Sequence, residues 1–215
     1  MADGLDGAAL TYSGPAEYAL ADWRRRINDL YCDIRQMPDP QRAHAHWQGA
    51  RSRLFRDHPM SPVPQGQRPG FGSIGIYPYD PSWRFLVDLE PKSGPEETHS
   101  LGQDGQMVTR SLGRTRGLAD ICGSELSAFW ITGYGGGLFL PFRDATNGSD
   151  TYGGGRYLAD AIKGADLGLD PDGRLIIDFN FAYTPSCAWN DAFVCPLSPP
   201  ENTLPVAVTA GERAP

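Results

Sequence analysis

The chain has 215 residues, of which 40% are hydrophobic and 21% charged, so it can bury a core and is not broadly disordered. Its formal net charge is −7 at pH 7, which opposes binding to nucleic acid or to an anionic membrane, and we expect neither as a partner. There are 26 glycines and 19 prolines, a composition that favours short strands and tight turns over long helices.

The beginning of the sequence is small and acidic. Residues 1–12 lack the basic stretch and apolar core of a signal peptide, so we expect a disordered leader on a cytoplasmic protein. No apolar run approaches the ~20 residues that a membrane span needs. Because the cytoplasm is reducing, the four cysteines are expected to be free thiols.

Two amphipathic helices are predicted within residues 13–57. In the first, apolar residues at positions 20, 23, 27, 30, 31 and 34 recur at helical spacing. Two prolines then end that helix, and Asp39, which lies between them, can cap the second helix. We expect the pair to form a helical hairpin that packs through its apolar side.

The remainder of the chain, residues 65–215, is typical of short antiparallel strands. Hairpin signals occur at 104–105, 147–148 and 172–173. Strands are predicted at 71–79, 83–90, 98–103, 106–113, 125–134, 138–146 and 174–183, with an edge strand at 206–210. Prolines after Tyr183 exclude a central strand there, so this tail is expected to wrap over an edge or an end of the sheet.

These elements predict a single α+β domain over residues 13–215. The helical hairpin would pack on an antiparallel β-barrel or barrel-like sheet, of which a split barrel is one form. A closed or nearly closed sheet is favoured because an open one leaves its edge strands unpaired.

The segment 174–183 suggests a site. As a strand it would point Asp178 and Asn180 to one face and large apolar residues to the other. If that polar face lines the barrel mouth, a buried carboxylate there could act as a general base, and an arginine such as Arg143 could hold a substrate oxygen. The structural alternative is an Arg–Asp pair that ties loops together at the end of the barrel.

Eight residues therefore make up the predicted site. The candidates for catalysis are Asp178, Tyr152 and His58, and those for substrate binding are Arg143, Arg156, Asn180, Tyr183 and Asp144. The glycines at 153–155 are expected to form a bulge or bend at a barrel corner, where a ligand could approach the backbone.

Cys187 and Cys195 lie close together in the sequence, with four interpretations open. They could be buried free thiols, a disulfide, zinc ligands, or include a nucleophile with His58 as its base. The spacing is not that of a CxxC motif and no histidine cluster accompanies it, so no metal site is predicted.

The C-terminal half carries long motifs: RDATNGSDTYGGGRYL, DFNFAYTPSC, and CPLSPPENTLP followed by AGE. With the earlier LFRDHPMSP, they resemble the bacterial domain-of-unknown-function family 1684, and the resemblance covers most of the chain from about Trp23 onward. Phe181, Trp189 and Ser198 depart from the pattern of that family. The family carries no assigned activity, so the resemblance implies none, but it indicates that the shared motifs and the predicted site coincide.

We expect a small-molecule enzyme with a polar site at the barrel mouth, for which hydrolysis, isomerisation and cyclisation are all compatible reactions. A second hypothesis is a barrel that binds a flavin or another small molecule without chemistry. A third is a structural or dimerisation module, and a homodimer is compatible with each. The sequence does not indicate a particular cofactor.

Overall fold

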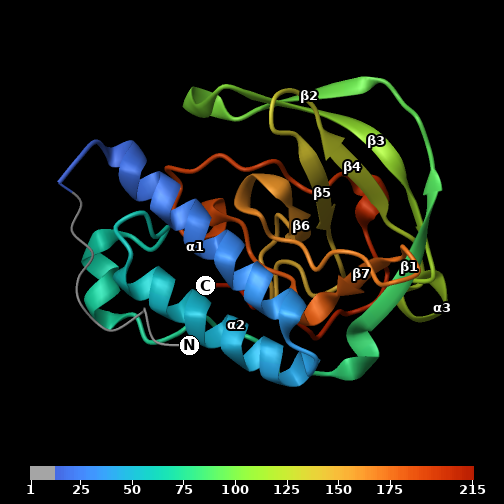
Figure 1. Cartoon of the computed structure of the whole chain (residues 1–215), viewed down its shortest axis with the longest axis horizontal. Coiled ribbons are helices and arrows are strands. Elements are labelled where there is room, and N and C mark those ends of the chain that lie inside the picture. Colours follow the sequence, from blue (N-terminus) through green and yellow to red (C-terminus); the bar gives the residue numbers. More distant parts are fainter. Residues whose placement is uncertain (1–12) are drawn as a thin grey trace.

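The structure is a computed structural model that describes residues 13–215 (Figure 1). The leader predicted for residues 1–12 lies outside the described residues. Two long helices are followed by an antiparallel, nearly closed barrel-like sheet, so the predicted α+β class is confirmed. Within the described part of the chain, no helix has both the length and the apolarity to cross a bilayer.

The helical hairpin consists of α1 (Ala16–Gln36) and α2 (Pro40–Asp57), which lie side by side in Figure 1. The Asp39 side chain caps α2 by accepting hydrogen bonds from the backbone N–H groups of Gln41 and Arg42, at 3.0 and 3.3 Å. The predicted cap is therefore confirmed, and it starts α2 directly after the turn that reverses the chain.

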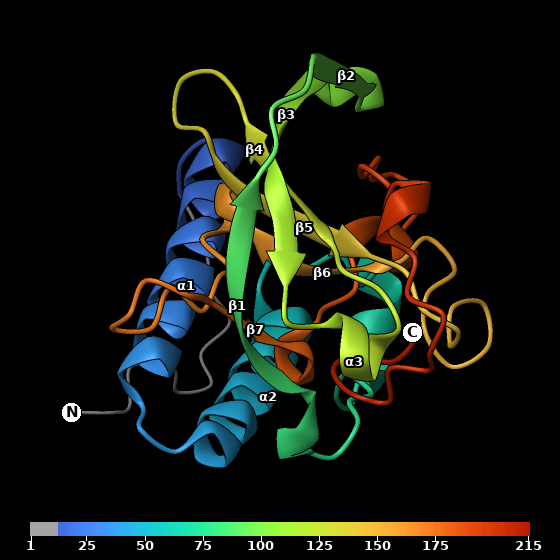
Figure 2. The same ribbon diagram turned by 90° about the vertical axis from the view of Figure 1, so that its right-hand side faces the viewer.

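The sheet has seven strands within residues 13–215, joined in the order β6-β5-β4-β3-β1-β7, with β2 paired to β3. Their bounds are β1 Arg84–Pro91, β2 Glu96–Ser100, β3 Gln106–Arg116, β4 Ser127–Ile131, β5 Gly137–Phe142, β6 Arg156–Asp160 and β7 Leu175–Asp178. A short helix, α3 (Ala119–Cys122), joins β3 to β4. Figure 2 shows the β2–β3 hairpin, predicted from its turn residues, extending beyond the rest of the sheet.

The two ends of the sheet meet through the chain that follows β7. Tyr157 on β6 and Tyr183 form an antiparallel bridge with backbone N–H to O distances of 2.9 and 3.0 Å. This bridge brings the segment after β7 against β6, the strand at the far end of the sheet, and so nearly closes the barrel.

Both faces of the central strands are buried, each in its own apolar core. On β5, Phe139 joins the core beneath α1 and α2, whereas Leu140 joins a second core with β1, β7, α3 and the C-terminal segment. The alternation of strand side chains therefore places helices over one face and the C-terminal tail over the other.

Where the proline-rich tail crosses the sheet, the side chain of Asn202 supplies several of the hydrogen bonds between them. Its Nδ2 donates to the carbonyl oxygens of Ser127 and Pro141, at 2.8 and 2.7 Å, and its Oδ1 accepts from the N–H of Ser127 at 2.7 Å. Asn202 thus supplies the hydrogen bonds that prolines cannot donate, and the tail crosses the ends of β4 and β5.

Two of the predicted strands are wrong, and a third is shorter than predicted. Residues 71–79 contain only an isolated bridge at Ile76, and residues 206–210 form no strand. The segment 174–183 is a strand only from Leu175 to Asp178, after which residues 179–181 turn into a 3-10 helix that the Asp178 side chain caps. Side chains such as Ser52 at Ile74 and Arg156 at Val208 supply backbone hydrogen bonds that a sheet would otherwise provide.

Replacing Asp39 with alanine should lower the free energy of unfolding by about 1 kcal/mol, because α2 loses its cap. Urea-induced unfolding followed by circular dichroism measures the change. Asp29→Ala is the matched control, since it removes an exposed carboxylate from the middle of α1 and should change stability by less than about 0.5 kcal/mol. Equal losses in the two variants would contradict a capping role.

Candidate functional site

Asp178 and Asn180 do lie together, although not through strand alternation. Asp178 Oδ1 accepts from the backbone N–H and the Nδ2 of Asn180, at 3.0 and 2.8 Å. Asn180 in turn pairs with the backbone of Asp80, donating to its carbonyl at 2.8 Å and accepting from its N–H at 2.9 Å. These bonds join the end of β7 to the loop before β1.

The arginine beside Asp178 is Arg84, its cross-strand partner on β1, and not Arg143. Arg84 Nη1 lies 3.1 Å from Asp178 Oδ2, and the carboxylate is fully shielded from solvent. Burial raises the pKa of Asp178, while the hydrogen bonds from Asn180 and Arg84 oppose that rise. Both carboxylate oxygens are occupied by protein donors, so the group acts as a junction between segments.

Arg156 and Asp144 form a second buried pair, at 2.8 Å between Nη2 and Oδ2, with both side chains fully shielded from solvent. Arg156 also donates to three carbonyl oxygens of the C-terminal tail, those of Val208, Ala210 and Glu212. Asp144 Oδ1 accepts from the N–H of Val208 at 3.2 Å. The pair therefore binds the tail, which takes the place of the substrate expected from the sequence.

Glu212, from the AGE motif, connects this tail to the helical hairpin. Its Oε1 accepts from Arg51 Nε on α2 at 2.6 Å, and its Oε2 accepts from the N–H of Thr184 at 2.8 Å. The Arg51 guanidinium lies 4.9 Å from the centre of the Phe55 ring and 5.1 Å from that of Tyr183. Glu212 and Arg51 were not among the predicted residues, yet they join helices, sheet and tail.

Three of the four remaining predicted residues lie in separate places. Tyr183 donates from its hydroxyl to Asp160 Oδ2 at 3.2 Å, and burial raises its pKa well above the usual value. His58 is fully buried at the end of α2, where its Nδ1 accepts from the N–H of Met60 at 3.0 Å. Arg143 pairs through its backbone with the tail on either side of residue 203.

One predicted residue, Tyr152, lies in a half-buried cluster with both of the nearby cysteines. Its hydroxyl is 3.6 Å from Cys187 Sγ, and the thiols of Cys187 and Cys195 share a hydrogen bond. We call Tyr152, Cys187 and Cys195 the thiol corner. All four cysteines of the chain are free, and no group of three or more metal-binding side chains occurs within residues 13–215.

The pKa values of the two cysteines in the thiol corner are shifted in opposite directions. The hydrogen bond from Cys195, aided by those from Tyr152 and the backbone, lowers the pKa of Cys187 to about 6 against the cost of burial. The same bond and burial raise the pKa of Cys195. Hydrogen bonding to Cys187 and burial raise the pKa of Tyr152 to about 12, so its hydroxyl remains a donor at neutral pH.

Neighbouring residues hold the thiol corner in place. Tyr157 donates from its hydroxyl to the carbonyl of Pro196, directly after Cys195. Lys163, which lowers the pKa of both thiols, pairs with Asp160 at 3.3 Å and lies over the rings of Tyr157 and Tyr183. A cavity of only about 20 Å³ adjoins Lys163, Thr184 and Ser186, and none of the three residues of the thiol corner lines it.

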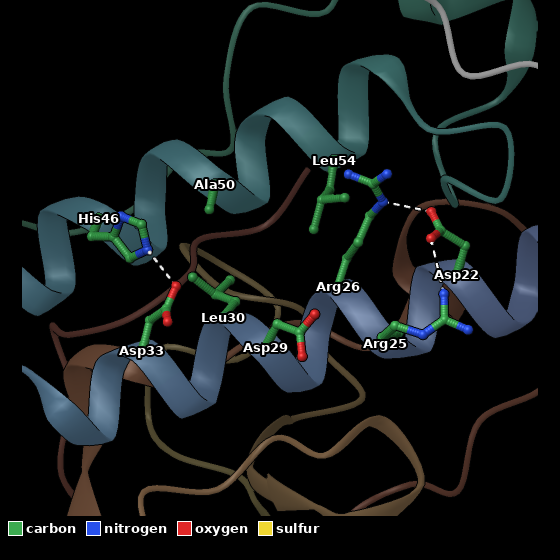
Figure 3. Close-up of a pocket in the computed structure, with 9 residues that line it drawn as sticks. All are labelled: Asp22, Arg25, Arg26, Asp29, Leu30, Asp33, His46, Ala50 and Leu54. Atoms are coloured by element: carbon green, nitrogen blue, oxygen red, sulfur yellow. Dashed lines mark hydrogen bonds and ion pairs between the residues drawn. The ribbon is translucent and has the colours of Figure 1, made fainter. Parts of the chain in front are cut away.

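A groove of about 330 Å³ lies between α1 and α2 (Figure 3). Its floor is apolar, and its rim carries charges of both signs that pair with each other, such as Asp33 with His46 at 3.7 Å and Arg25 with Asp22 at 3.3 Å. None of the eight predicted site residues lines it.

Comparisons with known proteins place the chain in a family. The family described as "Protein of unknown function (DUF1684)" matches residues 69–213, and the chain belongs to it, as its motifs predicted. The chain is also similar to an uncharacterized protein from gene locus rrnAC0354 of Haloarcula marismortui, whose structure was solved by NMR in solution. The identity is 32% over 77% of this chain and 89% of that one, with a TM-score of 0.50. No curated protein matches.

Asp144→Ala should destabilise the fold by about 3–5 kcal/mol, because it leaves the Arg156 guanidinium buried without its counter-charge. Asp172→Ala is the control, since it breaks an exposed ion pair with Arg174 that contributes about 0–1 kcal/mol. Urea titration gives both values. A loss below about 1 kcal/mol for Asp144→Ala would show that the pair does not hold the tail.

Proposed function

We propose that the protein is a small-molecule enzyme whose site is the thiol corner and whose nucleophile is Cys187. The observation that supports this most is the Tyr152 hydroxyl, which lies 3.6 Å from the Cys187 sulfur and stays protonated at neutral pH, where it can stabilise the thiolate. A thiolate is the reactive form of cysteine, and donors that stabilise it increase the fraction present at neutral pH.

The distribution of buried charge also favours this location. Asp178, Asn180, Arg156 and Asp144 each bind other parts of the protein through their polar atoms. Cys187 is instead only half-buried and has no such structural bond to the backbone of a distant segment. In this proposal the buried pairs hold the fold, and the shallow thiol corner performs the chemistry.

The chemistry is covalent. The Cys187 thiolate would attack an electrophilic atom of the substrate while Tyr152, which stays protonated, donates a hydrogen bond at the site of attack. Lys163 adds a positive charge that favours the thiolate and an anionic leaving group. We place this reaction in the cytoplasm, where both cysteines remain reduced between turnovers.

Alkylation by iodoacetamide tests the nucleophile. The rate at Cys187 should rise through an apparent pKa near 6, whereas an ordinary cysteine titrates near ~8.5. At pH 5.5 we expect a rate about tenfold above that of an ordinary cysteine, because a far larger thiolate fraction outweighs the lower intrinsic nucleophilicity of that thiolate. Peptide mass spectrometry identifies the modified residue.

Tyr152→Phe should move the midpoint of that profile to higher pH, since one donor to the thiolate is lost. Tyr134→Phe is the matched control, because Tyr134 lies fully exposed in the β4–β5 loop. A midpoint near ~8.5 in the unaltered protein would contradict the proposal.

Gly154 positions Tyr152. A Cβ at Gly154 would lie 2.4 Å from Tyr152 Cε1, so Gly154→Ala forces the ring to move away from its place beside Cys187. We expect the alkylation midpoint to rise as it does in Tyr152→Phe. Gly153→Ala is the control, since a Cβ there meets nothing closer than 3.8 Å. If the two alanine variants have the same pH profile of alkylation, Tyr152 does not stabilise the Cys187 thiolate.

A second candidate function is binding of a small molecule without chemistry, which the groove in Figure 3 favours by its volume of about 330 Å³ and its apolar floor. Ligand-induced thermal shifts in a compound screen test it: a shift abolished by Leu30→Glu but retained in Cys187→Ser supports the groove. Light scattering in the same samples tests whether the chain forms a homodimer.

A further inference from the structure

We propose that Cys187 and Cys195 form a redox pair whose substrates are small-molecule disulfides with apolar groups beside the sulfur atoms. The inference rests on the proposed nucleophilic role of Cys187 and assigns to it a reaction and a class of substrate. Its basis is the geometry of the thiol corner. Cys187 Sγ lies 3.6 Å from the Tyr152 hydroxyl, Leu197, two residues after Cys195, approaches Gly154 beside the same tyrosine, and the segment 187–195 is anchored near both ends.

The anchoring keeps the thiols in contact. Trp189, two residues after Cys187, packs edge-on against Phe55 of α2 and against Phe71, with ring centres 5.1 and 5.8 Å apart. At the other end, the Tyr157 hydroxyl binds the carbonyl of Pro196. The segment between the cysteines is therefore a short loop fixed to the body at both ends, which favours closure of a disulfide over separate reactions of two thiols.

The two cysteines have different parts in the reaction. Cys187 attacks first, because the Tyr152 hydroxyl lies 3.6 Å from its sulfur and can stabilise the thiolate. Cys195 attacks once the Cys187 sulfur has formed a new bond.

Each step balances. The Cys187 thiolate attacks the substrate RS–SR, forming a Cys187–S–S–R mixed disulfide and releasing RS⁻, which takes a proton from water. Cys195 then attacks the Cys187 sulfur, its proton passes to the departing sulfur, and a second RSH leaves. Two electrons have moved from the cysteine pair to the substrate, and the Cys187–Cys195 disulfide remains. A low-molecular-weight thiol then reduces this disulfide in two exchange steps and completes the cycle.

The surface around the pair indicates the substrate class. Val194 and Leu197 flank Cys195 in the sequence and are 47% and 52% exposed, so an apolar surface adjoins the thiols. Leu197 also approaches Gly154, next to the loop that carries Tyr152, which places it at the rim of the thiol corner. Apolar groups on either side of an S–S bond would contact this rim, and the shallow site leaves room for them.

The test uses Ellman's disulfide, 5,5′-dithiobis(2-nitrobenzoate), on protein carrying Cys32→Ser so that this partly exposed thiol does not contribute. We expect release of two nitrothiobenzoate ions per chain and no retained aryl group, because Cys195 displaces it. With Cys195→Ser added, one ion should be released and one aryl group retained on Cys187. Intact mass spectrometry counts the retained aryl groups, and peptide mapping identifies the residue that carries them. Circular dichroism checks that each variant folds, and Cys195→Ala is a second variant for the case in which Cys195→Ser does not fold.

The outcomes separate the two proposals. Two ions released with two aryl groups retained would mean that the thiols react independently, which overturns the redox pair and leaves the nucleophile intact. No reaction of Cys187 at pH 5.5 would overturn the proposed function itself. For the substrate class, Leu197→Ser should lower the rate with the aromatic disulfide at least about threefold more than the rate with cystamine. Equal effects on both would exclude the apolar rim.

Discussion

The buried pair of Arg156 and Asp144 is the constraint on which the rest of the structure depends. Two charges without solvent are costly unless each is paired and hydrogen-bonded, and Arg156 meets that requirement only when the C-terminal tail supplies its carbonyl oxygens. The tail in turn brings Glu212 to Arg51 on α2. One arginine therefore determines how strand β6, the tail and the helices come together.

The position of the thiol corner follows from the same arrangement. Because the tail covers one face of the sheet and the helices cover the other, the segment between β7 and the tail must cross the end of the barrel. The bridge from Tyr157 to Tyr183 begins that crossing, and the bond from Tyr157 to Pro196 fixes its far end. Cys187 and Cys195 lie within this crossing, as does Trp189, which packs on Phe55 of α2.

The sequence brought several candidate residues together but did not give the contacts that the structure shows for them. Asp178 and Asn180 are adjacent as predicted, yet alternation along a strand cannot show whether a carboxylate faces a ligand or caps the next turn. Spacing likewise could not reveal that Arg84 across the ladder, and not Arg143, would be the partner of Asp178. The role of Glu212 was missed because a single glutamate near the end of a chain carries no periodic signal.

By itself, the sequence determined the helical hairpin, the cap at Asp39, the β2–β3 hairpin, the α+β class and membership of the family, because these depend on residue periods, turn residues and motifs that are local in the chain. Only the tertiary structure decided which polar groups bind other parts of the protein and which remain accessible to solvent. This division depends on contacts between residues as far apart in the sequence as Arg51 and Glu212. It also depends on the free-energy cost of burying a charge, because that cost is offset only when the partner of the charge is in place.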